Sequence, residues 1–318
     1  ATQPELLLLD ELFAGLVPSE VELILKYVKK VSKELGITLL IVEHVLRVVM
    51  SLCDKVFVLE NGQIIANGSP EELLKHIWEV TVMLLQVKNL NVVLGGLQIL
   101  QGVNFHVNEG ELVVVVGSNG AGKSTTLRSI CGMNPIVSGT VVFDGKDITG
   151  ISSYECAEMG LCMVPEGRQL FPEISVRENL LMGAYHYRKN KKRVMENLEK
   201  CYEMFPVLKK YENRISSTFS GGEQQMISIA RGLMSEPKIM MIDEMSLGLA
   251  PLIIEQLFRT IKDLNKTGMS ILLIEQNARQ ALAIADRAYV MENGTVTMEG
   301  TGQELLNNEQ VKTAYLGF

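Results

Sequence analysis

The sequence predicts an α/β fold in which the ends of parallel strands bind a charged ligand. An apolar run over Leu112–Val116 predicts a buried strand, and a helix-compatible stretch over Thr126–Ile130 follows a glycine-rich loop. A second apolar run, Ile239–Ile242, ends in the paired acids Asp243 and Glu244. Adjacent acids directly after a buried strand cost free energy unless they serve a charged ligand.

The loop after the first strand has the pattern of a phosphate-binding loop. Its members are Gly117, Ser118, Asn119, Gly120, Ala121, Gly122, Lys123, Ser124 and Thr125. The glycines let backbone N–H groups turn toward phosphate oxygens at the positive end of the following helix. In this pattern Lys123 reaches the β- and γ-phosphates, and the Ser124 hydroxyl is a ligand of Mg²⁺.

The sequence contains two further motifs. The paired acids Asp243 and Glu244 fit a nucleotide site, whereas the other motif is by itself an ordinary helix cap or turn. In such a site Asp243 holds Mg²⁺ through water, and Glu244 polarises the attacking water as a general base. The other motif is Ser220, Gly221, Gly222, Glu223 and Gln224, which precedes a helix-like run.

The order of these motifs resembles that in the ATPase subunits of ABC transporters. The resemblance covers residues 84–318 and implies a P-loop NTPase of RecA-like fold, with an antiparallel β subdomain and a helical subdomain over about 176–231. It implies ATP and Mg²⁺ as cofactors and ATP hydrolysis as the activity. It also implies head-to-tail pairing, in which the signature Ser220–Gln224 acts on the ATP of a partner chain.

Finer features resemble one subfamily. Glu166, within Val164–Arg168, stands where the family usually has a glutamine, so it is predicted as a metal ligand or a permease contact. Gln276 stands where most members have a histidine that faces the γ-phosphate, and we include it with Glu244 among the catalytic residues. With Glu299–Gly302 and Ala314–Gly317, these residues resemble the LivF-type subunit of branched-chain amino-acid importers. The alternative is the ATPase of a related importer, such as one for urea or other amides, where we expect glutamine in place of Glu166.

The start of the chain repeats the distal half of such an ATPase. Leu6–Glu11 matches Ile239–Glu244, and Ile41–His44 matches Leu273–Gln276. The sequence of residues 1–83 contains neither a phosphate loop nor a Ser-Gly-Gly motif.

We therefore predict three segments. Residues 1–76 resemble a truncated C-terminal part of a LivG-type sister subunit, as a true fusion or an artefact. Residues 77–83 form the junction, and residues 84–318 form a complete ATPase domain. Because the first segment lacks the phosphate-loop strand that would normally lie among its own strands, we expect it to be loosely held or to pack nonspecifically on the complete domain.

Partners and location follow from the same resemblance. One phosphate loop and one signature predict that turnover needs a second ABC ATPase chain, either LivG-type or another copy. Permease subunits are the other expected partners, on the inner face of the cell membrane, where a cytoplasmic protein would bind peripherally. The net charge of −7 disfavours nucleic acid. No apolar run approaches the roughly 18 residues that span a bilayer, and no covalent membrane anchor is expected.

A non-catalytic function remains the alternative. The chain could be a nucleotide-binding regulator that does not hydrolyse ATP, or an inactive fusion product. Gln276 cannot carry the positive charge of histidine, and the equivalent His44 lies in the half without a phosphate loop. Leu94 also stands close to where relatives stack an aromatic ring on adenine. The five cysteines lack metal-ligand spacing and are predicted to be reduced thiols.

Overall fold

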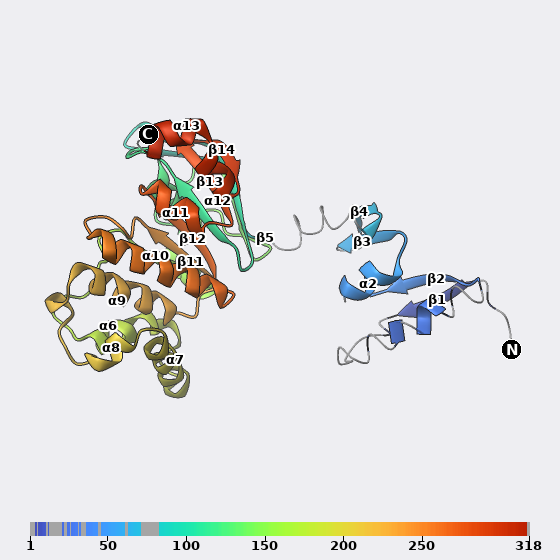
Figure 1. Ribbon diagram of the computed structural model, residues 1–318, viewed down its shortest axis with the longest axis horizontal. Coiled ribbons are helices and arrows are strands. Elements are labelled where there is room, and N and C mark those ends of the chain that lie inside the picture. The colour runs from blue at the N-terminus through green and yellow to red at the C-terminus, as the bar shows by residue number, and fades with distance from the viewer. Residues whose placement is uncertain are drawn as a thin grey trace. The chain divides into compact units, whose positions relative to one another are not determined.

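The strands of the computed structural model belong to two separate units, residues 1–82 and 83–318 (Figure 1). The structure describes residues 4, 6–10, 12, 21, 24–25, 27–30, 32, 36–43, 46–60, 63–70 and 83–316. His44 and most of the predicted junction lie outside the described residues. Among the described helices, none is long and apolar enough to cross a membrane.

The described residues of the first unit form two small sheets. Strands β1 (Leu6–Asp10) and β2 (Thr38–Val42) pair in parallel, and β3 (Val56–Glu60) and β4 (Gln63–Gly68) pair in antiparallel. Helix α2 (Leu46–Leu52) lies between the two pairs in the sequence.

The parallel pair in this unit exposes apolar side chains. Leu8 is 65% exposed and Leu40 is 54% exposed. The corresponding strand of the second unit, β11 (Ile239–Asp243), is buried at every position. The apolar side chains of β11 are therefore all buried, whereas alternate side chains of β1 and β2 are exposed.

A six-stranded sheet forms the centre of the second unit, in the order β10-β11-β12-β7-β13-β14. All neighbours in this sheet are parallel except β13 and β14, which are antiparallel. The bounds are β7 (Leu112–Val116), β10 (Leu161–Val164), β11 (Ile239–Asp243), β12 (Ser270–Glu275), β13 (Arg287–Glu292) and β14 (Thr295–Gly300). The predicted strands over 112–116 and 239–242 are confirmed, and the antiparallel edge strand β14 is an addition to the expected parallel sheet.

A second sheet is antiparallel, with the order β6-β5-β8-β9. It contains β5 (Met83–Leu94), β6 (Leu97–Asn108), β8 (Ser138–Phe143) and β9 (Lys146–Asp147). The turn between β5 and β6 lies at Gly95 and Gly96, whose φ angles of 56° and 82° favour glycine.

Helices cover the central sheet, and a group of them packs at one end (Figure 1). They are α4 (Lys123–Ile130), α5 (Ser153–Met159), α6 (Val176–Gly183), η1 (Tyr185–Tyr187), α7 (Lys191–Met204), α8 (Pro206–Lys210), η2 (Ser216–Thr218), α9 (Gly221–Leu233), α10 (Pro251–Lys266), α11 (Ala278–Ile284), α12 (Gly302–Asn307), α13 (Glu309–Val311) and η3 (Lys312–Leu316). Capping boxes at Ser152, Ser175, Ser220 and Thr301 fix the starts of α5, α6, α9 and α12.

Two apolar cores lie on opposite faces of the central sheet. Along β7, Val114 and Val116 belong to the core that includes the helical group, while Val113 and Val115 belong to the core under the antiparallel sheet. A strand buried on both faces needs apolar residues at every position, which is why Leu112–Val116 has no polar alternation.

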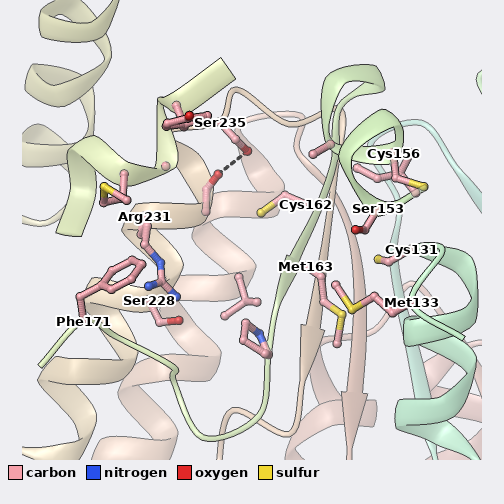
Figure 2. Close-up of a pocket in the computed structure, with 18 residues that line it drawn as sticks. Cys131, Met133, Ser153, Cys156, Cys162, Met163, Phe171, Ser228, Arg231 and Ser235 are labelled. Carbon is pink, nitrogen blue, oxygen red and sulfur yellow. Dashed lines mark hydrogen bonds between the residues drawn. The ribbon is translucent and has the colours of Figure 1, made fainter. Parts of the chain in front are cut away.

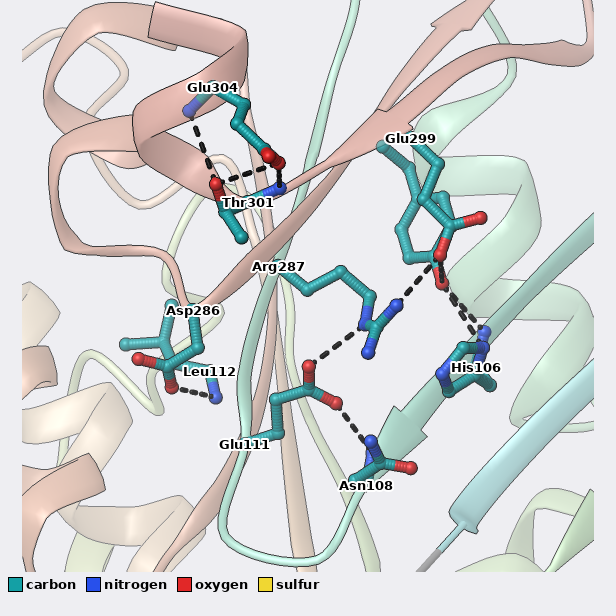
Figure 3. Close-up of polar contacts among 10 residues, drawn as sticks. His106, Asn108, Glu111, Leu112, Asp286, Arg287, Glu299, Thr301 and Glu304 are labelled. Carbon is teal, nitrogen blue, oxygen red and sulfur yellow. Dashed lines mark hydrogen bonds and ion pairs between the residues drawn. The ribbon is translucent and has the colours of Figure 1, made fainter. Parts of the chain in front are cut away.

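A polar network links β13 and β14 to the antiparallel sheet (Figure 3). Arg287 pairs with Glu111 at 2.9 Å and with Glu299 at 2.8 Å. The Tyr289 hydroxyl lies 3.3 Å from His106 Nδ1 on β6. On β7, the register partners of Arg287 and Tyr289 are Val113 and Val115, which precede the phosphate loop.

Candidate functional site

The phosphate loop starts where β7 ends and closes at the first turn of α4. At Gly117, an added Cβ would lie 2.3 Å from the Met291 carbonyl oxygen. At Gly122, φ is 101°, and a Cβ would lie 2.7 Å from Leu100 Cδ2. Both positions therefore require glycine, and the loop can pass close to its neighbours only because it has no side chains there.

Lys123 lies inside this loop, and its side chain is almost fully buried. Its Nζ donates to the carbonyl oxygens of Gly117 at 2.9 Å and Ser118 at 3.1 Å. The same Nζ forms an ion pair with Glu244 Oε1 at 3.1 Å. The structure thus brings together the lysine of the loop and Glu244, the acid that follows β11.

Ser124 and Asp243 form the second link between the loop and β11. The Ser124 hydroxyl donates to Asp243 Oδ1 at 2.8 Å. Asp243 is fully buried, and its Oδ2 has no hydrogen-bond partner in the part of the chain that the structure describes. Burial raises the pKa of this carboxyl, the Ser124 bond opposes the rise, and the charge of Glu244 adds to it. A buried carboxylate oxygen without a donor, beside a hydroxyl, is a donor set that suits Mg²⁺.

Glu166 contributes charge near this pair. It is one of the groups that raise the pKa of Asp243. Among the described residues, however, no three His, Cys, Asp or Glu side chains are grouped so that they could hold a metal ion. The protein oxygens offered to a metal are therefore those of Ser124 and Asp243, and a ligand role for Glu166 stays a prediction.

A cavity of about 330 Å³ contains the predicted catalytic residues Glu244 and Gln276. Its other lining residues are Ser246, Leu247, Gly248, Leu249, Ile254, Glu275 and Asn277. Glu244 has a φ of 42°, and its backbone N–H donates to the Ile274 carbonyl at 2.9 Å. The end of β12 therefore positions the acid that follows β11.

Glu275, which we did not single out from the sequence, is part of the same arrangement. It is the last residue of β12 and is fully buried. Its Oε1 accepts from the Ser246 N–H at 3.0 Å, and its Oε2 accepts from the Ser246 hydroxyl at 2.6 Å. Burial raises the pKa of Glu275 to about 7, while the bonds from Ser246 act in the opposite direction. A carboxylate that ends an otherwise apolar strand is the sequence signal that could have identified it.

The Ser-Gly-Gly motif forms the start of α9. Ser220 N and Oγ both donate to Glu223 Oε2, at 2.8 and 2.7 Å. Gln224 Nε2 donates to the Phe219 carbonyl at 3.0 Å. In the described part of the chain, no hydrogen bond of Ser220–Gln224 reaches the phosphate loop. The signature therefore presents a helix N-terminus that its own loop does not use.

The loop after Glu166 is held against this helix. Gly167, Arg168 and Gln169 have φ angles of 73°, 68° and 43°, a run of left-handed residues that needs external support. Arg231 Nη1 donates to the Gln169 carbonyl at 2.8 Å, and the Ser228 hydroxyl donates to the Arg168 carbonyl at 2.9 Å. Two residues of α9 thereby fix the loop's shape, a role that local sequence patterns did not suggest.

A pocket of about 450 Å³ lies beside this loop (Figure 2). Its lining is mostly apolar and rich in sulfur, with Cys131, Met133, Cys156, Cys162, Met163, Phe171, Met182 and Tyr185 among its residues. All five cysteines of the chain are free thiols, and burial raises the pKa of Cys162 to about 11. The reduced state of these thiols stays a prediction.

Comparisons with known proteins agree with the geometry. The model of the ABC transporter family matches residues 100–246. The high-affinity branched-chain amino acid transport ATP-binding protein BraG of Pseudomonas aeruginosa is 47% identical over 224 residues, covering 70% of this chain and 95% of BraG. The chain belongs to the ATP-binding proteins of ABC transporters.

Another member of the family and a solved structure are also similar to this chain. The probable branched-chain amino acid transport ATP-binding protein LivF of Archaeoglobus fulgidus is 34% identical, covering 74% of this ABC ATPase and 99% of LivF. A solved nucleotide-free ATP-binding cassette from an ABC transporter superposes with a TM-score of 0.66 at 30% identity, covering 74% of this chain and all of that one. The predicted family and the P-loop ABC ATPase fold are confirmed.

Proposed function

We propose that this chain is the ATP-hydrolysing subunit of an ABC importer for branched-chain amino acids. The observation that carries the proposal is the double link between loop and strand: Lys123 to Glu244 and Ser124 to Asp243. These links support a single site in which the four side chains would serve phosphate, metal and water. The names of BraG and LivF support branched-chain amino acids as the cargo.

Each loop residue has a defined part in this proposal. Backbone N–H groups of residues 117–125 bind the phosphates, and Lys123 exchanges its carbonyl partners for phosphate oxygens. Glu244 accepts the proton of the attacking water, and Gln276 donates a hydrogen bond to the γ-phosphate. Ser124 and Asp243 would hold Mg²⁺, which would neutralise phosphate charge when bound.

The second ATP-binding chain is part of the proposal. The N–H groups at the start of α9 are directed by the Ser220 capping box, and they make no contact with this chain's own loop in the described residues. A helix N-terminus of this kind suits the γ-phosphate of ATP on another chain. We infer that Ser220–Gln224 serves a LivG-type subunit or a second copy.

The remaining proposals concern the permease and the first unit. We place the permease contact on the loop Glu166–Arg168 and the sulfur-rich pocket beside it, on the inner face of the membrane. We also propose that residues 1–76 derive from a LivG-type subunit. Residues 77–83 would then be the junction, and residues 84–318 would be the complete ATPase domain. The uncovered strands β1 and β2 are consistent with a partial domain.

Steady-state ATP hydrolysis tests the function. The full chain is assayed with Mg²⁺ alone, and then together with an intact LivG-type subunit. We expect the partner to stimulate turnover, and we expect Glu244→Gln to abolish the stimulation. ATP binding without turnover in both settings would identify the chain as a non-hydrolysing nucleotide-binding module instead.

A further inference from the structure

Glu275 is a buried acid to which the catalytic scheme above gives no part. It ends β12, and its register neighbour on β7 is Val116, the residue before the phosphate loop. Gln276 follows it directly in the sequence. Glu275 therefore lies where β7, β11 and β12 deliver the functional residues.

Among the described residues, the hydrogen bonds to the Glu275 carboxylate come from Ser246, two residues after Glu244, and from Asn277, two residues after Glu275. Both carboxylate oxygens accept from Ser246, one from the backbone N–H and one from the hydroxyl. A backbone hydrogen bond from Asn277 also favours the charged form. Ser246 itself is buried at 9% exposure, so the bonds are shielded from water.

The segment held in this way carries a strained residue. Glu244 has a left-handed backbone, which non-glycine residues adopt only when their surroundings impose it. Its N–H is bonded to Ile274, and two residues later Ser246 is bonded to Glu275. The end of β12 thus holds the segment on both sides of Met245.

A purely structural bond would not require an acid here. No arginine, lysine or histidine forms an ion pair with Glu275 in the described part of the chain. The charge that acts on its pKa is that of Glu244, which raises it. A buried carboxylate without a cation costs free energy that an amide or hydroxyl would avoid. Groups with unfavourable burial of this kind cluster at functional sites.

We propose that Glu275 is a positioning residue of the ATPase site, which acts through Ser246 to fix Glu244 and Gln276 around the γ-phosphate. The inference rests on the proposed function and extends it to a residue that does not touch the nucleotide. Loss of Glu275 should lower kcat and leave the binding of ATP unchanged, because Glu275 positions the attacking groups and, among the described residues, its carboxylate makes no hydrogen bond to the phosphate loop.

A double-mutant cycle tests the proposal in the full chain with its LivG-type partner. Glu275→Ala should lower kcat by about 100-fold and leave KM for ATP within about twofold. Ser246→Ala, which keeps the backbone bond, should lower kcat by about tenfold. In the Glu275→Ala background, Ser246→Ala should cost little more, because the two residues act as one unit. Glu275→Gln should restore only part of the rate, since the amide can accept from the Ser246 N–H but has an NH2 donor where the hydroxyl finds its acceptor in the wild type.

Controls separate positioning from folding and from the proposed function itself. Glu299→Gln removes a carboxylate from the network of Figure 3 and should leave kcat unchanged. The proposal would be overturned if kcat fell only in proportion to the fraction of chains that no longer bind ATP. It would also be overturned if the effects of Glu275→Ala and Ser246→Ala were additive. Absence of wild-type turnover would contradict the proposed ATPase function. In that case, hydrogen exchange at the Ser246 amide tests whether Glu275 positions this segment. Faster exchange in Glu275→Ala supports it, and unchanged exchange overturns it.

Discussion

At the scale of single residues, the site is held by pairs that nucleotide binding must rearrange. The ammonium of Lys123 is bonded to two loop carbonyls and to Glu244. Phosphate oxygens must replace these partners, and the negative charge of Glu244 competes with them for the same cation. The acid that we propose as the general base is therefore also expected to weaken the binding of ATP.

Glu244→Gln should consequently bind a non-hydrolysable ATP analogue about fivefold more tightly, because the neutral amide no longer competes for Lys123. Titration of the full chain with a fluorescent analogue measures the change. Glu299→Gln is the matched control and should bind as the wild type does. Equal or weaker binding by Glu244→Gln would show that the ion pair does not oppose the phosphates.

Glu275 gives a pH dependence of stability whose sign follows from its raised pKa. The folded pKa is about 7 against a reference of 4.5, so the folded state holds this proton more tightly than the unfolded chain does. The resulting stability is complete below pH 4.5 and is lost as the pH rises through about 7. The loss should be about 3 kcal/mol.

Urea unfolding of the wild type and Glu275→Gln, followed by circular dichroism from pH 4.5 to 8, isolates this contribution. Relative to the variant, the wild type should lose stability as the pH rises, because the amide does not titrate. A difference between the two proteins that stays constant with pH would contradict the assignment.

At the scale of elements, apolar runs and turn signals were enough to predict the strands. Four consecutive valines after Leu112 can only be satisfied by burial on both faces, and Gly95–Gly96 supplies the left-handed turn between β5 and β6. Strands β5 and β6 have 12 residues each. Register shifts at bulges let these long strands include polar residues.

The contacts between elements could not be predicted in the same way. The sheet order places β12 between β11 and β7, which brings Glu275 next to Val116 from a distant part of the sequence. Ser246 and Arg231 act through similar long-range contacts, and neither carries a local pattern. Motifs indicated the residues that we propose bind the nucleotide, while the residues that support them depend on the topology of the sheet.

The sulfur-rich pocket gives a prediction at this scale. Met182 lines it from α6 and is 45% exposed, so Met182→Glu would place a charge on its apolar rim. We expect this change to weaken association with the permease at least tenfold and to leave ATP turnover of the isolated ATPase unchanged. Co-purification from detergent measures the association.

Met204→Glu is the control for this experiment, because Met204 on α7 is 40% exposed but does not line the pocket. Equal effects of the two substitutions would place the permease contact elsewhere.

At the scale of the whole molecule, the two units differ in how well their sheets are covered. Strand β11 is buried at every position, whereas β1 leaves Leu6 and Leu8 more than half exposed. A sheet of two strands buries too little apolar surface to offset the ordering of its chain. The complete domain and the first unit should therefore differ in resistance to proteases.

Limited proteolysis of the full chain should remove residues 1–76 well before it cuts the rest. Mass spectrometry of the surviving fragment should show a start near residue 83, where the second unit begins. Equal survival of both units would contradict the interpretation of the first as a partial domain.

The central claim is that Lys123, Ser124, Asp243 and Glu244 form a working ATPase site. The most direct measurement is the fate of radiolabelled ATP after it is mixed with Mg²⁺, the LivG-type partner and either wild type or Glu244→Gln. We predict that the wild type releases ADP, while the variant retains intact ATP. Retention of intact ATP by both proteins would contradict the claim.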